Sequence, residues 1–147
     1  MLIISPRVEL NYSRDLVDCA KNRAKDLGLE VLVLEDVHSS HHIDKTEAEL
    51  AAFWQEHPGI DAVVCASTSF AYAIIAYLDK QNLEIGREVD VMVREFIPLL
   101  KRFKPSLITV PEDVATAGGF LAKAVLHRIT EPDEAPLQGL ERPSLSD

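Results

Sequence analysis

Apolar residues along this chain fall into two alternating patterns: short continuous runs, and longer stretches in which an apolar residue recurs every third or fourth position. A short apolar run is typical of a buried strand, whereas the wider spacing is typical of one face of a helix. Five runs predict strands, at residues 2–5, 31–34, 60–66, 89–93 and 107–110. Four spaced stretches predict helices, at residues 13–27, 44–57, 70–81 and 112–129.

Strands that alternate with helices predict an α/β fold, in which a doubly wound, mostly parallel sheet is flanked by helices. The run 60–66 is apolar apart from Asp61, as expected of a central strand covered on both faces. The segment 70–78 is apolar almost all the way round, which predicts a helix that is buried on more than one side or that carries a subunit interface. The proline-containing tail from Glu131 is expected to be an extended connection.

Polar residues follow the predicted strands at their carboxyl ends, which is where doubly wound sheets bind their ligands. These residues offer hydrogen-bond donors and acceptors of both polarities, as a ligand with hydroxyl or amide groups requires. They include Arg14, His38, Ser67, Thr68, Arg94 and Glu95. Arg94 and Glu95 directly follow a buried strand, although a surface ion pair is the alternative interpretation of these two residues.

Composition narrows the classes of function that these residues can serve. The 147 residues suit one domain, with 47% hydrophobic and 27% charged residues. The net charge of −9 gives no basic footprint for nucleic acid, and the basic run 101–104 is expected to be a solvated loop. Cys19 and Cys65 are expected to be reduced core residues. With no evident signal peptide or membrane-length apolar stretch, a cytoplasmic protein without membrane contact is expected.

No group of residues has the spacing of a catalytic or metal site, so neither an enzyme nor a cofactor is expected. Phosphate-binding loops place glycines between strand and helix, whereas the turns here carry Ser, Thr, Asn and Arg. The segment 67–69, Ser-Thr-Ser, lacks the flanking glycines of a nucleophile elbow. His38, His41 and His42 form the alternative, a metal site, but they have no fixed helical spacing, and a solvated loop is expected.

From residue 59 onward the order of motifs resembles the lactose-repressor family of bacterial transcription regulators. Ile60-Asp-Ala-Val-Val-Cys-Ala-Ser-Thr-Ser-Phe-Ala-Tyr-Ala-Ile is similar to the family's strand, Asn-Asp turn and alanine-rich helix. Leu83-Glu-Ile-Gly-Arg-Glu-Val-Asp-Val-Met-Val resembles its Gly-x-x-Pro-x-Asp-Val-Ser-Val-Val-Gly signature. Lys104-Pro-Ser-Leu-Ile-Thr-Val resembles the Pro-Pro-Leu-Thr-Thr-Ile crossover, and Gly118 matches the glycine of the helix that follows.

The resemblance implies two similar α/β subdomains joined by crossover strands, with the effector held between them. Residues 1–109 correspond to the C-terminal subdomain, residues 110–133 to a crossover and a helix of the N-terminal subdomain, and residues 134–147 to a return crossover and tail. The family's helix-turn-helix has no counterpart in this sequence, so DNA contact is expected only through such a domain of the full-length protein. Without the rest of its subdomain, the helix 113–129 is expected to dock on a neighbouring copy or to swing away.

The resemblance also implies effector-binding roles at particular positions. Glu95 corresponds to the family's effector-binding aspartate, and Ser67 and Thr68 replace its Asn-Asp turn. Glu112 stands where a polar crossover residue faces the effector. The implied effector-binding set is Arg14, His38, Ser67, Thr68, Arg94, Glu95 and Glu112, for a small polar effector, either sugar-like or another metabolite.

Two departures from the family's pattern bear on the identity of the effector. The family's effector-binding arginine falls on Leu16, with Cys19 and Ala20 in place of the Gly-Phe that follows it, so Arg14 is the candidate replacement. The family's Gly-[Tyr/Phe]-Asp reads Val-Arg-Glu at residues 93–95. These changes predict an effector different from the sugars and purines of close relatives.

The family's dimer interface corresponds to the helix at residues 70–78 and the region around Phe103. The implied interface residues are Phe70, Ala73, Ile74, Tyr77 and Phe103. The chain is thus expected to be the ligand-sensing and homodimerising portion of a regulator whose effector controls operator affinity. The alternatives are a sugar-binding transport-type protein of the same fold and a receiver-like signalling domain. The receiver needs a phospho-acceptor Asp after the third strand, where Ala66-Ser67 stands.

Overall fold

The computed structural model describes residues 1–5, 11–35, 43–95 and 99–140. The elements in chain order are β1 (Leu2–Ile4), α1 (Asn11–Asp26), β2 (Leu32–Leu34), α2 (Ile43–Glu56), β3 (Ala62–Cys65), α3 (Thr68–Gln81), β4 (Asp90–Glu95), α4 (Leu100–Phe103), β5 (Ile108–Pro111) and α5 (Val114–Thr130). The α/β class and the five predicted strands are confirmed. The short helix α4 was not predicted, because four residues are too few to show a helical period.

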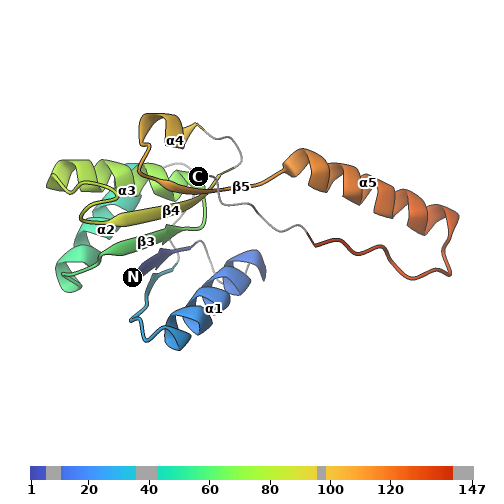
Figure 1. The fold of residues 1–147 in the computed structure, drawn as a ribbon, viewed down its shortest axis with the longest axis horizontal. Coiled ribbons are helices and arrows are strands. Elements are labelled where there is room, and N and C mark those ends of the chain that lie inside the picture. The colour runs from blue at the N-terminus through green and yellow to red at the C-terminus, as the bar shows by residue number, and fades with distance from the viewer. Residues whose placement is uncertain (6–10, 36–42, 96–98, 141–147) are drawn as a thin grey trace.

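The strands form one parallel sheet in the order β2-β1-β3-β4-β5 (Figure 1). The chain begins at β1, continues to β2 at one edge of the sheet, and then crosses back over β1 to β3. The order therefore reverses between β1 and β3, where the registered pairs Leu2–Val63 and Ile4–Cys65 join the two strands. At such a reversal the connections leave in opposite directions, and a crevice opens beyond the carboxyl ends of the strands.

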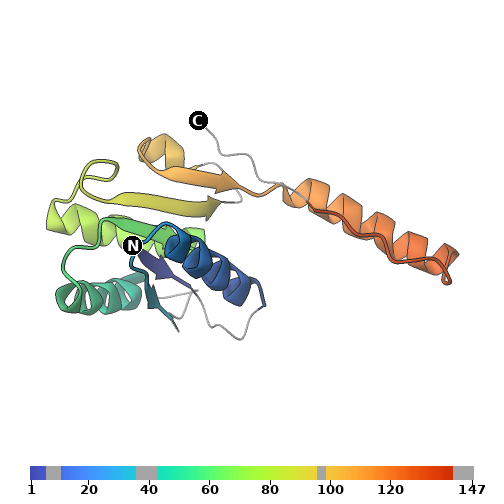
Figure 2. The same ribbon diagram turned by 60° about the horizontal axis from the view of Figure 1, so that its bottom comes forward.

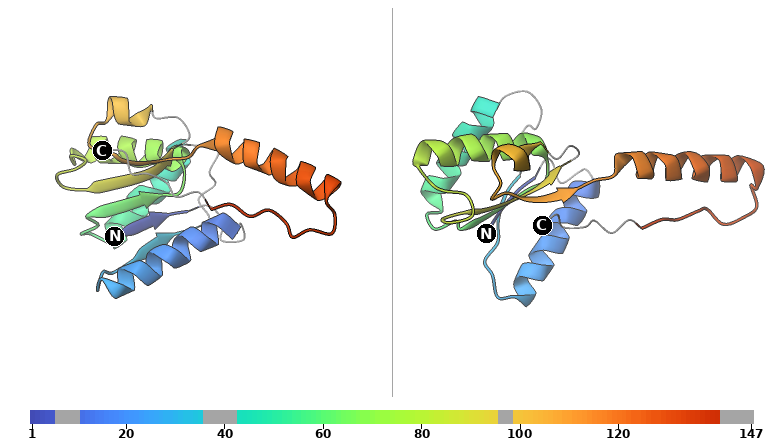
Figure 3. Two further views of the ribbon diagram at one scale, coloured as in Figure 1. Left: turned by 45° about the vertical axis from the view of Figure 1, so that its right-hand side comes forward. Right: turned by 45° about the horizontal axis from the view of Figure 1, so that its top comes forward.

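Helices cover both faces of the sheet, with α1 on one face and α2 and α3 on the other (Figure 3). Alternate residues of β1 divide between these faces, because successive side chains of a strand point in opposite directions. Leu2 and Ile4 join the main apolar cluster with α2 and α3 residues such as Leu50 and Leu78. Ile3 lies outside that cluster but is equally buried, as is Val17 of α1. Burial on both faces explains why the strands are continuously apolar.

One face of helix α3 is buried in the core of the subunit. Phe70, Ala73, Ile74 and Tyr77 are all buried within the chain's own core, and the ring of Tyr77 lies 5.3 Å from that of Trp54 in α2. These four side chains are therefore not available to a second subunit, which corrects the prediction that they form a dimer interface. Of the five predicted interface residues, only Phe103 is exposed, at 74%.

Helix α5 projects away from the sheet and has no buried residue (Figure 2). Its N-cap is Asp113, whose carboxylate accepts hydrogen bonds from the Thr116 amide at 2.9 Å and the Thr116 hydroxyl at 2.7 Å. Residues 131–140 turn back along the helix without forming a helix or strand, which confirms the extended connection predicted for this part of the tail. A search of the described segments for a helix long and apolar enough to cross a bilayer finds none.

Candidate functional site

Three of the predicted effector-binding residues lie together at the carboxyl edge of the sheet. The hydroxyl of Thr68, the first residue of α3, donates to the carbonyl oxygen of Arg94 at 3.4 Å. The Arg94 Nε forms an ion pair with the Glu112 Oε1. The register of the sheet brings them together, because Arg94 pairs with Val110 and Glu112 follows the last residue of β5. We call Thr68, Arg94 and Glu112 the edge cluster.

The edge cluster is neither fully buried nor fully solvated. The side chains of Arg94 and Glu112 retain 31% and 28% of their exposure, so their attraction is screened less than that of a surface pair while water or a ligand can still reach them. The guanidinium supplies several fixed donors, and the carboxylate supplies acceptors only. The pair can therefore hold a neutral polar ligand through hydrogen bonds without a charge on the ligand.

Ser67 precedes the edge cluster and contributes a buried hydroxyl. It is the N-cap of α3, with an extended backbone (φ −151°, ψ 161°), but its hydroxyl makes no capping hydrogen bond. Within the described residues, its oxygen and those of Ser5 and Ser13 are the buried side-chain oxygens or nitrogens without a hydrogen-bond partner. Such groups are uncommon in folded proteins because each costs free energy of desolvation.

Ser13 was among the polar residues expected after the first strand but not in the effector-binding set, and Ser5 was not singled out from the sequence. Ser5 follows β1 and Ser13 lies in the first turn of α1, so both belong to the edge at which the strand order reverses. Both residues are fully buried. A polar residue directly after an apolar run, as in Leu-Ile-Ile-Ser, is the signal that could have drawn attention to Ser5.

Of the three other predicted effector-binding residues, Arg14 is the one whose side chain lies in the described part of the structure. Arg14 is exposed and donates to the Asn11 Oδ1 at 2.9 Å, one turn away on the same helix. Glu95 is the last residue of β4, but its side chain lies outside the described part of the structure, as does all of His38. His41 and His42, the other members of the metal alternative, also lie outside it. Among the described residues, no group of His, Cys, Asp or Glu is arranged to hold a metal ion.

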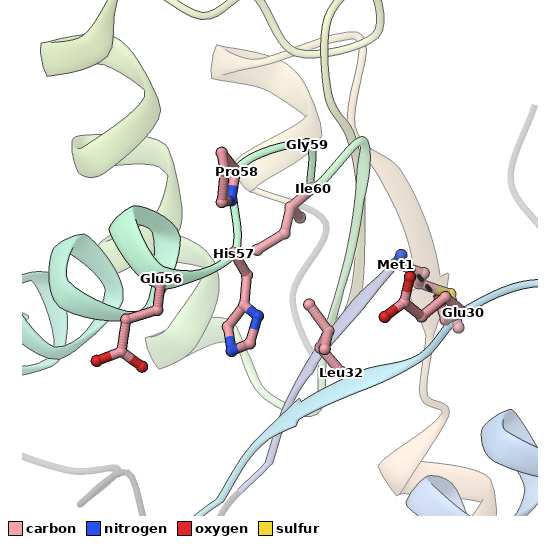
Figure 4. A pocket seen from close by; sticks show the side chains of 8 residues that line it. All are labelled: Met1, Glu30, Leu32, Glu56, His57, Pro58, Gly59 and Ile60. Carbon is pink, nitrogen blue, oxygen red and sulfur yellow. Dashed lines mark hydrogen bonds between the residues drawn. The ribbon is translucent and has the colours of Figure 1, made fainter.

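Two cavities lie at the opposite, amino edge of the sheet. One has a volume of about 260 Å³ and lies between the end of α2 and β2, with His57 pointing toward Leu32 (Figure 4). The other, of about 580 Å³, includes Asp61 and Asp90 at the starts of β3 and β4. Both cavities are also lined by polar and charged residues, among them His57, Asp61 and Asp90. The carboxyl edge remains the candidate ligand site because parallel α/β sheets bind their ligands beyond the carboxyl ends of the strands.

Burial and capping shift three pKa values in the described part of the chain. Burial raises the pKa of the Cys65 thiol in β3, so this sulfur stays protonated and is a poor nucleophile. Burial also raises the pKa of Tyr77. The hydrogen bond from the Thr116 amide lowers the pKa of Asp113, and the Thr116 hydroxyl adds to this effect. None of these groups belongs to the edge cluster.

Comparisons with known proteins agree with this geometry. A family model described as a periplasmic binding protein-like domain matches residues 1–146. A search of curated proteins by sequence finds no match. Among solved structures, the trehalose repressor from Escherichia coli is 18% identical with a TM-score of 0.76, and a Lac repressor bound to ONPG in its repressed state is 12% identical with a TM-score of 0.83. A LacI-family regulator from Enterococcus faecium with bound ribose is 15% identical with a TM-score of 0.77.

These likenesses cover nearly all of this chain but only part of the other proteins. Each covers 99% of this chain, whereas the covered share of the solved protein is 54%, 44% and 54% in the same order. The chain thus spans about half the length of the structures it matches. At these identities the likeness establishes a shared fold, and it includes the part of the chain that holds α5.

Proposed function

We propose a function from one premise, which is that the chain belongs to the periplasmic binding protein-like domain family. On that premise, the chain is the ligand-sensing and dimerising portion of a transcription regulator of the lactose-repressor type. A small polar effector bound at the carboxyl edge would control the operator affinity of the full-length protein. The observation that carries this proposal is the edge cluster, which joins the sheet to the crossover at the edge where the fold binds ligands.

The effector class follows from the chemistry of that edge. Arg94 and Glu112 neutralise one another, and the nearby hydroxyls of Ser67 and Thr68 are uncharged. Such a surface suits a neutral compound with several hydroxyl groups, because each hydroxyl can both donate and accept. Solved relatives include structures with bound ribose and lactose, which are compounds of this class.

The position of Glu112 explains how binding could change the shape of the protein. We propose that residues 1–109 form one subdomain, that 110–133 form the crossover and a helix of a second, and that 134–147 return toward the first. Glu112 lies directly between β5 and the cap of α5. A ligand that contacts both Arg94 and Glu112 would therefore favour one angle between the sheet and α5 over others.

The dimer prediction is retained with a different set of side chains. Tyr72 on the outer face of α3 is exposed, as are Leu99 and Phe103 at the ends of α4. The two helices are joined where Lys104 contacts Asp79 at 2.7 Å. We propose that Tyr72, Leu99 and Phe103, which we call the α3–α4 surface, carry the homodimer contact, because large apolar side chains left exposed favour protein interfaces.

Calorimetric titration with a panel of neutral sugars and sugar alcohols tests the effector proposal. Because the sequence departs from the family's effector-binding positions, the panel extends beyond the ribose and lactose found in the solved relatives. At least one sugar should release or absorb heat with the wild type, and Arg94→Met or Glu112→Gln should weaken that binding at least tenfold. The matched control is the exposed pair of Arg87 and Glu84, 3.3 Å apart at the other end of the sheet. Arg87→Met should leave the affinity unchanged. Binding that is equally weakened by Arg87→Met, or unaffected by Arg94→Met, would contradict the assignment of the site.

A further inference from the structure

Ser5 lies at the end of β1, on the face of the sheet that α1 covers. The Ser5 amide donates to the Leu34 carbonyl oxygen at 3.2 Å, so the chain continues the ladder of β1 for one residue beyond Ile4. Side chains alternate along a strand, so Ser5 points to the same face as Ile3. Ile3 is buried outside the cluster that β1 forms with α2 and α3, and it therefore lies on the face covered by α1 (Figure 3).

Ser13 lies on the side of α1 that packs on the sheet. Ser13 and Val17, one turn apart, are both buried. The charged residues next to them on the helix are exposed, namely Arg14, Asp15 and Asp18. Because α1 connects the parallel strands β1 and β2, it runs back antiparallel to β1, and its first turn lies at the carboxyl end of that strand (Figure 1).

The spacing along the two elements sets the two serines opposite one another. Ser5 and Ile3 are two residues apart in an extended chain, which is about 6.6 Å at about 3.3 Å per residue. Ser13 and Val17 are four residues apart in a helix, which is about 6 Å at about 1.5 Å per residue. Ile3 and Val17 are the apolar side chains next to the serines in this interface, and packing one on the other brings Ser13 over Ser5.

The hydroxyls of Ser5 and Ser13 are buried without a hydrogen bond. Within the described residues neither has a partner, and the two do not bond to each other, although both oxygens are sealed from bulk solvent. A serine hydroxyl turns about its Cβ–Oγ bond and can both donate and accept, so the two would bond if their oxygens were within reach. Buried polar groups of this kind are commonly bridged by an internal water, which takes about two to four polar partners.

The chemistry around the two hydroxyls favours water over a metal ion. Both serines are neutral, and the charged residues of this part of α1 lie on its exposed side. A metal cation prefers carboxylate ligands, and no group of His, Cys, Asp or Glu among the described residues is arranged to hold one. Water can donate to one hydroxyl and accept from the other, which is what two neutral hydroxyls require.

We propose that Ser5 and Ser13 hold one internal water molecule between α1 and the sheet. The water gives both hydroxyls a hydrogen-bond partner and removes the cost of burying them alone. It also ties the first turn of α1, which carries Arg14, to β1 at the point where the strand order reverses. The inference goes beyond the proposed function and does not depend on an effector.

Magnetic relaxation dispersion of solvent ¹⁷O tests the proposal, because its amplitude counts the internal waters that stay bound to the protein. In the full chain, Ser5→Ala and Ser13→Ala should each lower the amplitude by one water. The double variant should lower it by the same amount, since a single water is shared. The matched control is Ser106→Ala, which changes an exposed serine before β5 and should leave the amplitude unchanged. An amplitude that neither single variant changes, or a loss of two waters in the double variant, would overturn the proposal.

Urea unfolding tests whether there is room for a water between the two hydroxyls. Ser13→Val adds a methyl group that can take the place of the water, so its urea midpoint should fall below that of Ser13→Ala by no more than the difference in helix propensity. The same pair of changes at the exposed Cys19 of α1, to valine and to alanine, measures that difference. A larger fall for Ser13→Val would mean that the interface is already filled and overpacked by the methyl group, which would overturn the proposal.

Discussion

Helices α3 and α5 have similar sequences in one respect and opposite surroundings in the structure. Both are rich in apolar residues with alanines between them, over 14 and 17 residues. Six residues of α3 are buried, whereas α5 has none. The difference arises because α3 follows a central strand and is folded back onto the sheet, whereas α5 follows the edge strand β5 and leaves the sheet (Figure 1). Apolar spacing thus indicates that a face needs a partner, and topology decides whether the chain itself supplies one.

The largest contrast should appear when one large side chain is truncated in each helix. Ile74→Ala, on the buried face of α3, should lower the free energy of unfolding by about 2–5 kcal/mol, because the substitution leaves a cavity and the surrounding side chains lose their contacts with Ile74. Leu121→Ala in dilute protein should change it by no more than about 0.5 kcal/mol. Urea unfolding followed by the fluorescence of Trp54, the single tryptophan, measures both. Equal losses would mean that α5 packs on the sheet.

Two glycines should extend the contrast to the backbone. Gly86 has a φ of +83°, and a Cβ there would lie 2.8 Å from the Ser106 Cβ, so Gly86→Ala should destabilise the sheet domain by about 1–3 kcal/mol. Gly119 lies within α5 with nothing within 4 Å of its Cβ position. Gly119→Ala should raise the helix content of α5, because alanine has a helix propensity up to about 1 kcal/mol more favourable than that of glycine. The urea concentration at the midpoint of unfolding should not fall. If Gly86→Ala raised the free energy of unfolding, the close approach of the Gly86 backbone to Ser106 would be contradicted.

A smaller effect should separate the edge cluster from a surface ion pair. A double-mutant cycle of Arg94→Gln and Glu112→Gln should give a coupling of about 1 kcal/mol, because these side chains are partly buried. The same cycle on Arg87 and Glu84 should give no more than about 0.5 kcal/mol, since both are exposed. Urea unfolding in low and high salt measures both couplings. Identical couplings, equally screened by salt, would show that the edge pair is an ordinary surface pair.

The smallest effect should be confined to the cap of α5. The folded pKa of Asp113 is lowered, so its capping contribution is complete above the ordinary aspartate pKa of about 3.9 and is lost as the pH falls through the lower folded value. Hydrogen exchange of the first-turn amides of α5 should therefore quicken, relative to the intrinsic rate, over that acid range. Asp113→Ala should show the faster exchange at every pH. A wild-type helix whose protection does not change over this range would contradict the capping role.

The positions and burial of the strands were predicted more accurately from the sequence than the exposed faces of the helices. Five apolar runs sufficed for the sheet because a parallel strand is buried on both faces and has no polar side to obscure it. The two faces of α3 could not be distinguished, because Tyr72 is exposed and Tyr77 is buried although both are aromatic. That distinction depends on packing against Trp54 in α2, a contact that the apolar spacing within α3 does not reveal.

The candidate site was predictable in part, for a similar reason. Thr68, Arg94 and Glu112 were expected from strand ends and from the family resemblance, and the parallel register brings them together. Ser5 was missed because one serine at a strand end does not reveal whether its hydroxyl finds a partner. The effector roles of all the predicted residues remain predictions, and His38 and the side chain of Glu95 lie outside the described part of the structure.

The central claim is that the carboxyl edge, and not the cavities at the amino edge, binds the effector. Amide resonances of the wild-type chain, followed by NMR during titration with the sugar that gives the largest calorimetric signal, test it directly. If the carboxyl edge binds the effector, the amide resonances of Ser67, Thr68, Arg94 and Glu112 shift in a saturable manner, whereas those of Gly59 and Asp61 do not. Shifts confined to Gly59, Asp61 and their neighbours at the amino edge would contradict it.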